Sequence, residues 1–181
     1  ILACGSKPII PNIPGLINSD HVITAHEMLR KDMILKKKNI VVIGGGLVGC
    51  ETAEYLKFHD NQVTIVEMLA DIALDVNPVY REDILERLAK NKIRILTSTR
   101  LEEIQRNLDK YVVINRKENG EIESIDCDDV VLACGARPNR ELEVVLKPYF
   151  NDYYLVGDCN CPGKILDAVY HSATTLIHLI D

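Results

Sequence analysis

The sequence predicts an α/β fold that combines a parallel sheet, covered by helices, with an antiparallel β-meander. Three observations carry this prediction. An apolar run over residues 40–44 leads into Gly44-Gly45-Gly46-Leu47-Val48-Gly49 and then into a helical pattern. A second apolar run, residues 63–67, ends in the acid Glu67. Strand-like segments then cover residues 100–106, 110–116 and 121–127, and Asn119-Gly120 predicts a tight hairpin between the last two.

The glycine-rich turn predicts a Rossmann-like site for a dinucleotide. Gly44 allows the tight turn from strand to helix, Gly46 leaves room for a pyrophosphate, and Gly49 allows close packing of helix on strand. The opening N–H groups of the helix, at Leu47 and Val48, would bring partial positive charge to the phosphates, and Gly45 would also contact the nucleotide. The alternative is a glycine-rich turn in another doubly wound sheet, including a methyltransferase-like sheet that binds S-adenosylmethionine.

The acid after the second strand indicates which nucleotide is bound. Glu67 would accept hydrogen bonds from the adenosine ribose hydroxyls, with Met68 beside the same nucleotide. A 2′-phosphate needs a nearby base, but the nearest downstream base is Arg81. Since two facing negative groups repel each other, the sequence favours NADH over NADPH.

The remaining elements of this region follow from local signals. Thr24 and Glu27 form a capping-box pattern for a short helix that reaches about residue 30. A longer helix is expected over residues 47–59. Asn77-Pro78 predicts the start of an amphipathic helix that ends near residue 91. Residues 93–96 and 130–133 predict two further strands, the first of them parallel to its neighbours.

A short internal repeat predicts the domain organisation. Ala3-Cys4-Gly5-Ser6-Lys7-Pro8 recurs as Ala133-Cys134-Gly135-Ala136-Arg137-Pro138. Each copy predicts the end of a strand, a glycine turn and an exit stiffened by proline. The repeat indicates one domain inserted into another at two similar crossings. We therefore expect residues 31–139 to form the inserted domain, and residues 1–30 and 140–181 to flank it.

The C-terminal segment carries a second functional signal. Residues 154–158 predict a strand that ends in Gly157-Asp158, and residues 164–180 predict a long helix. A carboxylate held at a strand end can accept hydrogen bonds from a polyol such as the ribityl chain of FAD. Asp158 could equally cap nearby backbone N–H groups, and the residues alone leave these two roles open.

Composition excludes several classes of function. The chain has 181 residues, of which 47% are hydrophobic, and a formal net charge of −6. This charge argues against a nucleic-acid surface, and no apolar run approaches the roughly 20 residues that span a bilayer. Most of the six cysteines lie in or beside apolar strands or the glycine-rich turn, which suits a cytoplasmic protein. The one close pair, Cys159 and Cys161, offers too few ligands for a metal site.

These motifs together resemble the flavoproteins of the pyridine nucleotide-disulfide oxidoreductase superfamily that carry two dinucleotide-binding domains. The resemblance covers nearly the whole chain. Residues 48–56 and 66–78 are similar to the C-terminal region of NADH:flavin oxidoreductases related to 2-enoate and 2,4-dienoyl-CoA reductases. The resemblance implies an N-terminal barrel like that of old yellow enzyme, with FMN and a 4Fe–4S cluster. It also implies an FAD domain that takes hydride from NAD(P)H and passes electrons to the barrel.

The resemblance also implies roles for particular residues. The glycines of the turn and Glu67 would hold NADH, and Gly135 would border the same nucleotide. Cys134 stands beside it, where the family commonly has Thr. Gly157 and Asp158 would touch FAD, with the turn at Gly5 near the place where the two cofactors meet. No side chain is expected to act as a catalytic acid or base, because the cofactors carry the chemistry.

The chain departs from this family in what it lacks. It begins at Ile1 inside an expected strand, and it contains one Gly-x-Gly-x-x-Gly, where the family has a second for FAD. We therefore expect an NADH domain flanked by incomplete FAD-domain segments, binding NADH weakly, losing FAD and inactive alone. Its partners would be the remainder of the parent polypeptide, or a second copy in a homodimer. The alternatives are a stand-alone nucleotide-binding module, or another FAD/NAD(P)H-dependent reductase or NADH oxidase.

Overall fold

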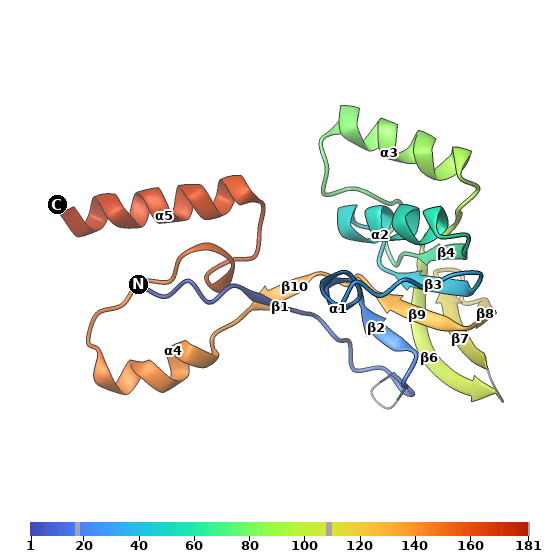
Figure 1. Ribbon diagram of the computed structural model, residues 1–181, viewed down its shortest axis with the longest axis horizontal. Coiled ribbons are helices and arrows are strands. Elements are labelled where there is room, and N and C mark those ends of the chain that lie inside the picture. Colours follow the sequence, from blue (N-terminus) through green and yellow to red (C-terminus); the bar gives the residue numbers. More distant parts are fainter. Residues whose placement is uncertain (17–18, 108–109, 181) are drawn as a thin grey trace. The chain divides into compact units, whose positions relative to one another are not determined.

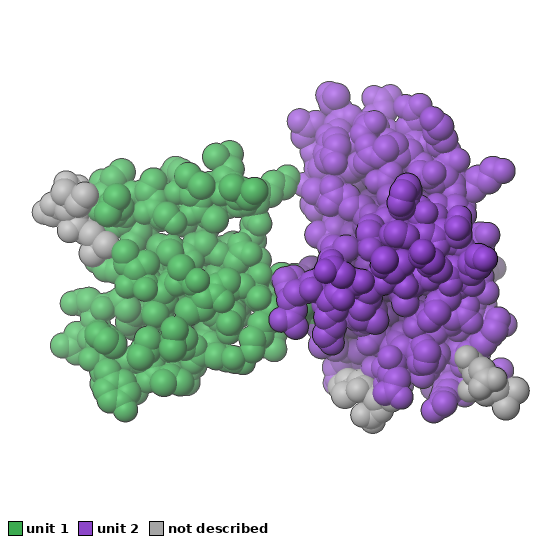
Figure 2. All heavy atoms as spheres, viewed as in Figure 1, with its two compact units in different colours: residues 1–9, 136–181 green, residues 10–135 purple. Residues whose placement is uncertain are grey.

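The chain folds into two compact units, which are described separately. The computed structural model describes residues 1–16, 19–107 and 110–180, the last three of them without their side chains. One unit contains residues 10–135, and the other contains residues 1–9 together with 136–181 (Figures 1 and 2).

The larger unit is built on a five-stranded sheet in which every pair of neighbouring strands is parallel. Its strand order is β2-β9-β3-β4-β5. The strands are β2 (Val22–Thr24), β9 (Asp129–Leu132), β3 (Asn39–Ile43), β4 (Gln62–Val66) and β5 (Arg94–Leu96). The parallel sheet, with the antiparallel strands described below, confirms the α/β fold class predicted from the sequence.

Three helices accompany this sheet: α1 (Ala25–Arg30), α2 (Leu47–Phe58) and α3 (Pro78–Lys90). The side-chain oxygen of Thr24 accepts a hydrogen bond from the backbone N–H of Glu27 and so caps α1. Asn77 caps α3 in the same way, with Pro78 at its first position. These capping signals are local. The helix ends predicted from the sequence therefore agree with the observed ends to within one residue.

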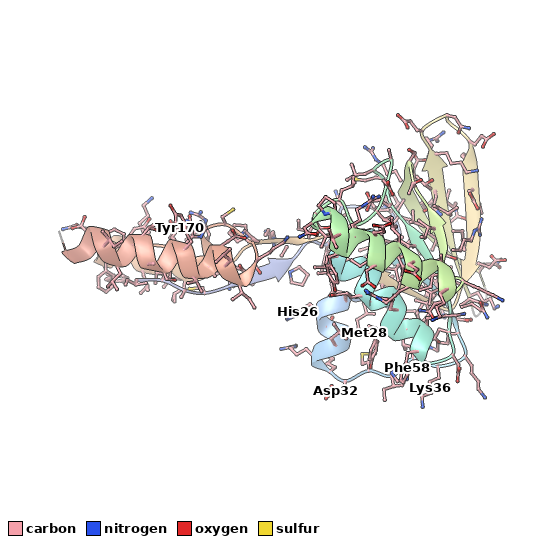
Figure 3. All side chains as sticks on the ribbon, turned by 90° about the horizontal axis from the view of Figure 1, so that it is seen from above. His26, Met28, Asp32, Lys36, Phe58 and Tyr170 are labelled. Atoms are coloured by element: carbon pink, nitrogen blue, oxygen red, sulfur yellow. The ribbon has the colours of Figure 1, made fainter. Side chains whose placement is uncertain are left out.

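The parallel sheet has a buried core on each face, because consecutive residues of a strand point to opposite sides. Ile40 and Val42 of β3 pack with apolar residues of the helices, including the fully buried Met28 of α1 (Figure 3). Val41 and Ile43 pack with residues of the antiparallel strands. Burial on both faces explains why this strand is a continuous apolar run.

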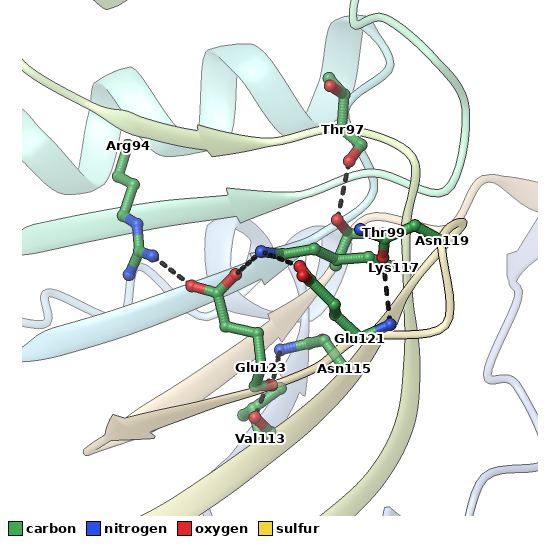
Figure 4. Close-up of polar contacts among 9 residues, drawn as sticks. All are labelled: Arg94, Thr97, Thr99, Val113, Asn115, Lys117, Asn119, Glu121 and Glu123. Atoms are coloured by element: carbon green, nitrogen blue, oxygen red, sulfur yellow. Dashed lines mark hydrogen bonds and ion pairs between the residues drawn. The ribbon is translucent and has the colours of Figure 1, made fainter.

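The antiparallel strands form the expected meander: β6 (Thr99–Asn107), β7 (Lys110–Lys117) and β8 (Ile122–Cys127). Polar contacts connect it to the parallel sheet (Figure 4). Glu123 of β8 makes an ion pair with Arg94 of β5 and lies 3.4 Å from Lys117 of β7. Lys117 also lies 3.4 Å from Glu121. The charged groups therefore link the edge of the parallel sheet to the hairpin.

The smaller unit contains β1 (Ser6–Pro8) paired antiparallel with β10 (Ala136–Pro138). The internal repeat therefore brings its own two copies together in one sheet. Short helices α4 (Glu141–Leu146), η1 (Lys147–Tyr149) and η2 (Gly157–Cys159) follow, and then the long helix α5 (Ile165–Ile180).

The strand expected over residues 154–158 is wrong. A single parallel bridge joins Leu155 to Leu2, and the chain then enters η2. The reason is local, because Gly157 has a φ of +66° and its carbonyl accepts hydrogen bonds from the N–H groups of Asn160 and Cys161. A left-handed residue followed by a turn cannot continue an extended strand.

The packing divides the chain at other positions than the repeat suggested. Residues 10–30 belong to the larger unit, because β2 joins the parallel sheet and the Ile104 N–H donates to the Pro14 carbonyl at 3.0 Å. Residues 136–139 pack in the other unit through β10. The assignment of residues 31–139 to an NAD(P)H-binding domain stays a prediction.

No helix in the described ranges combines the length and the apolar character that crossing a bilayer requires.

Candidate functional site

The carboxyl ends of the parallel strands carry the glycine-rich turn, which begins directly after β3. Gly44 has a φ of +107°, and its N–H donates to the Val66 carbonyl at 2.9 Å. A Cβ atom at Gly44 would lie 2.4 Å from the Ala133 carbonyl oxygen. Both the backbone angle and the lack of space therefore require glycine at this position.

Gly49 lies in the first turn of α2 and faces Gly44 at the start of the glycine-rich loop. A Cβ atom there would lie 1.9 Å from the carbonyl oxygen of Gly44, which is backbone and cannot swing away. The helix therefore lies against the end of β3 at a distance that only glycine permits. This is the close approach of helix to strand expected of the third glycine in a dinucleotide-binding turn.

Gly46 differs from the other two glycines, because a Cβ atom there would make contacts of ordinary length. It is the N-cap of α2 with extended backbone angles and no side-chain cap of its own. The atoms nearest to such a Cβ belong to the Asp75 carboxylate, at 3.5 Å or more. Leu47 begins the helix, and Val48 is 55% exposed. The approach to the first N–H groups of α2 is therefore bounded by Asp75.

Glu67 follows β4 and lies beside the turn. Its side chain is buried, with 7% of the residue's surface exposed. One carboxylate oxygen accepts a hydrogen bond from the Gly45 N–H at 2.6 Å, and the other accepts from the Leu69 N–H at 2.7 Å. Since an ionised carboxylate has about four lone-pair sites, two remain for further donors. Met68 is 62% exposed at the surface next to it.

Cys134 and Gly135 lie at the end of β9, next to the turn. The Ala133 N–H donates to the Ile43 carbonyl at 2.8 Å, and the Cys134 thiol lies 3.6 Å from the same carbonyl oxygen. Burial raises the pKa of the Cys134 thiol, which keeps it protonated at neutral pH. Gly135 has a φ of +87° and turns the chain away from the sheet.

Cys50 lies in the first turn of α2 and is fully buried. Its thiol donates to the Gly45 carbonyl at 3.4 Å. Burial, followed by the nearby carboxylates of Asp75 and Glu54, raises the pKa of this thiol to about 12. The thiol therefore acts as a small packing group under the turn and is not a thiolate nucleophile.

The other predicted site residues, Gly5, Gly157 and Asp158, lie in the smaller unit. Gly5 has a φ of +70°, and its carbonyl accepts a hydrogen bond from the Asn139 N–H at 3.0 Å. The Asp158 carboxylate accepts hydrogen bonds from the Ser6 hydroxyl at 3.1 Å and the Gly163 N–H at 3.3 Å. These contacts bring the strand of the first repeat copy and the Gly-Asp turn together.

Sequence reasoning missed Asp75 as a residue of this region. Its two carboxylate oxygens lie 3.0 and 3.2 Å from the Leu47 N–H, which donates to them. The signal that could have pointed to it is an acid two residues before the N-cap of the next helix, in the loop that follows β4 and Glu67. No cluster of three potential metal ligands occurs among the residues whose placement is given.

Comparison with known proteins gives a consistent result. The family model described as "Pyridine nucleotide-disulphide oxidoreductase" matches residues 1–170. The chain is 42% identical over 93% of its length to the NADH oxidase of Thermoanaerobacter brockii, and 35% identical over 94% to the cinnamate reductase of Clostridium sporogenes. It spans 26% and 25% of these two proteins, about a quarter of their length.

Solved structures show the same likeness. A 2-naphthoyl-CoA reductase complex superposes with a TM-score of 0.81 at 28% identity, covering 93% of this chain and 25% of that one. A water-forming NADH oxidase of Lactobacillus brevis bound to NADH superposes with a TM-score of 0.65 at 25% identity. That match covers 83% of this chain and 33% of the oxidase.

Proposed function

The chain belongs to the pyridine nucleotide-disulphide oxidoreductase family, and from this premise we propose that it is the NADH-binding portion of a flavin-dependent oxidoreductase. The observation that supports the proposal most strongly is the glycine-rich turn itself. Gly44 and Gly49 have no space for a side chain, whereas a Cβ atom at Gly46, at the N-terminus of α2, would make contacts of ordinary length, with the Asp75 carboxylate nearest. A turn that is tightly packed at Gly44 and Gly49 and less crowded at Gly46 fits a pyrophosphate.

The residues of the turn and Glu67 fit NADH in charge as well as in shape. The N–H groups that open α2 would bind the phosphates, with the helix dipole adding partial positive charge. Glu67 is held by two backbone N–H groups and keeps lone pairs that can accept from the ribose hydroxyls. A 2′-phosphate beside this carboxylate would meet repulsion, which supports a preference for NADH over NADPH.

FAD is proposed as a cofactor of the parent enzyme. Gly157 and Asp158 would contact it, and Gly5 would lie near the place where the two cofactors meet. When both cofactors are bound, NADH supplies a hydride and FAD accepts it. The residues of this chain would orient the nucleotide and contribute no acid or base. Asp158 is held by Ser6 and the Gly163 N–H and keeps lone pairs for a polyol hydroxyl.

The named relatives support a finer proposal for the parent. One relative is called cinnamate reductase, and cinnamate is a 2-enoate; a structural relative is called 2-naphthoyl-CoA reductase. We propose that the parent delivers electrons to an enoate- or dienoyl-CoA-reducing barrel with FMN and a 4Fe–4S cluster, all outside these 181 residues. A parent that is an NADH oxidase is the second candidate, favoured by the relative with 42% identity.

The smaller unit would have the remainder of the parent polypeptide as its partner. Its helices expose large apolar side chains, including Ile165, Leu166, Val144 and Tyr149, each at least 72% exposed. In the isolated chain these groups would favour a homodimer, which light scattering would detect. A monomer at all concentrations, with α4 and α5 fully protected from hydrogen exchange, would contradict this proposal.

The experiment that tests the proposed function is a titration of the 181-residue chain with NADH and with FAD, followed by the fluorescence of each cofactor. We expect NADH to bind and FAD to remain unbound, so that FAD passes through an ultrafiltration membrane that retains the protein. The reason is that the sequence has one glycine-rich phosphate turn, which the proposal assigns to NADH. No binding of NADH would overturn the proposed function. Tight binding of FAD would overturn the proposal that the flavin site depends on residues outside this chain.

A further inference from the structure

The N-terminus of α2 already holds an anion that belongs to the chain. Leu47 is the first residue of this helix, and its N–H points to both oxygens of the Asp75 carboxylate, at 3.0 and 3.2 Å. The same carboxylate lies 3.5 Å from the position that a Cβ of Gly46 would take. Asp75 thus lies beside Gly46 at the N-terminus of α2.

The backbone on both sides of Asp75 is fixed, so that this position is built into the loop. Two residues before it, Ala73 is held at a φ of +53°, and its N–H donates to the Gly45 carbonyl at 2.7 Å. Two residues after it, Asn77 caps α3 through hydrogen bonds from Val79 and Tyr80. Asp75 therefore lies at the middle of a short span between two anchors.

The apolar neighbours of Asp75 border a pocket. Leu74 and Val76, the two neighbours of Asp75, line a pocket of about 450 Å³ together with Pro78, Arg81, Glu82 and Leu85. Leu74 is 56% exposed, and Asp75 is an exposed residue. Because Asp75 is exposed, a side-chain rotation can take its carboxylate away from the Leu47 N–H without opening the core.

We propose that Asp75 is an affinity-determining residue of the nucleotide site, which occupies the phosphate position at α2 until a dinucleotide displaces it. This inference rests on the proposed function, because it takes the turn as the phosphate-binding element. A carboxylate and a phosphate cannot share one N–H group, and both are negative. Binding of the dinucleotide therefore requires Asp75 to leave, and the apparent affinity is reduced by the fraction of molecules in which it stays.

The test compares Asp75→Asn and Asp75→Ala with the unchanged chain, using calorimetric titrations with NADH and, separately, with inorganic pyrophosphate. Asn keeps an oxygen that can cap Leu47 but removes the charge, and Ala removes both. Glu82→Gln is the matched control, since it removes one negative charge from the wall of the neighbouring pocket. Circular dichroism of each variant shows whether it folds.

We expect both Asp75 variants to bind NADH and pyrophosphate about fivefold more tightly than the unchanged chain, with the Ala variant at least as tight as the Asn variant. Glu82→Gln should bind as the unchanged chain does. In nuclear magnetic resonance spectra, the amide signal of Leu47 should move in both Asp75 variants before ligand is added, and should move on titration in the unchanged chain.

The outcomes separate the two proposals. Equal or weaker binding of both ligands by the Asp75 variants overturns the role of Asp75, while NADH binding as such still supports the proposed function. Pyrophosphate binding that improves in the variants, with no NADH binding by any form, supports Asp75 as the occupant of the helix terminus and overturns the proposed function. If no form binds either ligand, both proposals fall.

Discussion

The Glu67 carboxylate and the Gly45 N–H are joined by a hydrogen bond of 2.6 Å. This contact connects the end of β4 to the middle of the glycine-rich turn. The carboxylate that would accept hydrogen bonds from the ribose therefore also fixes the backbone of the turn that would bind the phosphates. A Cβ at Gly45 would lie 3.0 Å from the Glu67 Cβ and 2.5 Å from Ile72, which leaves the turn little freedom. The backbone at Gly45 is therefore held in one conformation in the free chain.

The second and third glycines of the turn should respond differently to alanine. Gly49→Ala places a methyl group 1.9 Å from a backbone oxygen, and we expect it to lower the free energy of unfolding by about 1–3 kcal/mol. The methyl group of Gly46→Ala makes contacts of ordinary length in the free chain, so this variant should have nearly the same free energy of unfolding as the unchanged chain. It should nevertheless lose most NADH binding, because the methyl group enters the phosphate position.

Urea unfolding followed by circular dichroism, together with an NADH titration of each variant, checks this contrast. If Gly46→Ala bound NADH as well as the unchanged chain, the phosphates would have to lie elsewhere than at the start of α2.

Removing the polar side chain of Asn61 should clearly lower the free energy of unfolding of the larger unit. It is fully buried, accepts a hydrogen bond from the Lys38 N–H at 3.0 Å, and donates to the carbonyls of Leu35 and Leu56 at 2.7 Å each. Asn61→Ala removes these bonds from the Lys38 N–H and the Leu35 carbonyl and one of the two bonds to the Leu56 carbonyl, which also accepts from the His59 N–H, and we expect a loss of about 2–4 kcal/mol in unfolding free energy. The neighbouring exposed residue provides the control, Gln62→Ala, with a change below about 0.5 kcal/mol. Equal effects of both substitutions would contradict this account.

Two buried thiols should make the chain less stable at alkaline pH. Burial raises the pKa of Cys50 and of Cys127 to about 12, whereas a cysteine in the unfolded chain titrates near about 8.5. Between these values the unfolded state has released the proton and the folded state has kept it. The free energy of unfolding therefore falls as pH rises from about 9 towards 12, and below about pH 8 the effect is absent.

Urea unfolding at several pH values measures this slope. Cys127→Ala should make the slope of unfolding free energy against pH shallower by the contribution of at most about one proton, which is roughly 1.4 kcal/mol per pH unit. Cys161→Ala, at an exposed position, is the control. A slope that Cys127→Ala leaves unchanged would contradict the buried, protonated thiol.

Local signals in the sequence predicted most of the fold. The caps at Thr24 and Asn77 and the left-handed turn at Gly44 depend on residues next to one another, and the structure has each of them as expected. The prediction of a strand over residues 154–158 was wrong. The apolar residues there have a strand-like pattern, but Gly157 adopts a positive φ and begins a turn. The packing of residues 10–30 in the larger unit rests partly on the pairing of β2 with β9, which joins segments more than one hundred residues apart and follows from no local pattern.

The candidate site divides in the same way. The glycines and Glu67 follow a short motif with fixed spacing, so the sequence alone could predict them. Asp75 follows no such motif, and its relation to Leu47 depends on how the loop between β4 and α3 folds back over the turn. Its position became visible only from the three-dimensional contact.

The most direct test of the central claim is a calorimetric titration of the 181-residue chain with NADH and with NADPH, repeated for Glu67→Ala. We expect NADH to bind several-fold more tightly than NADPH, and Glu67→Ala to lose most of the affinity for NADH while remaining folded by circular dichroism. Glu86→Ala, which removes an exposed acid on α3, should bind as the unchanged chain does. Tighter binding of NADPH, or NADH affinity that does not depend on Glu67, would contradict the account of this site.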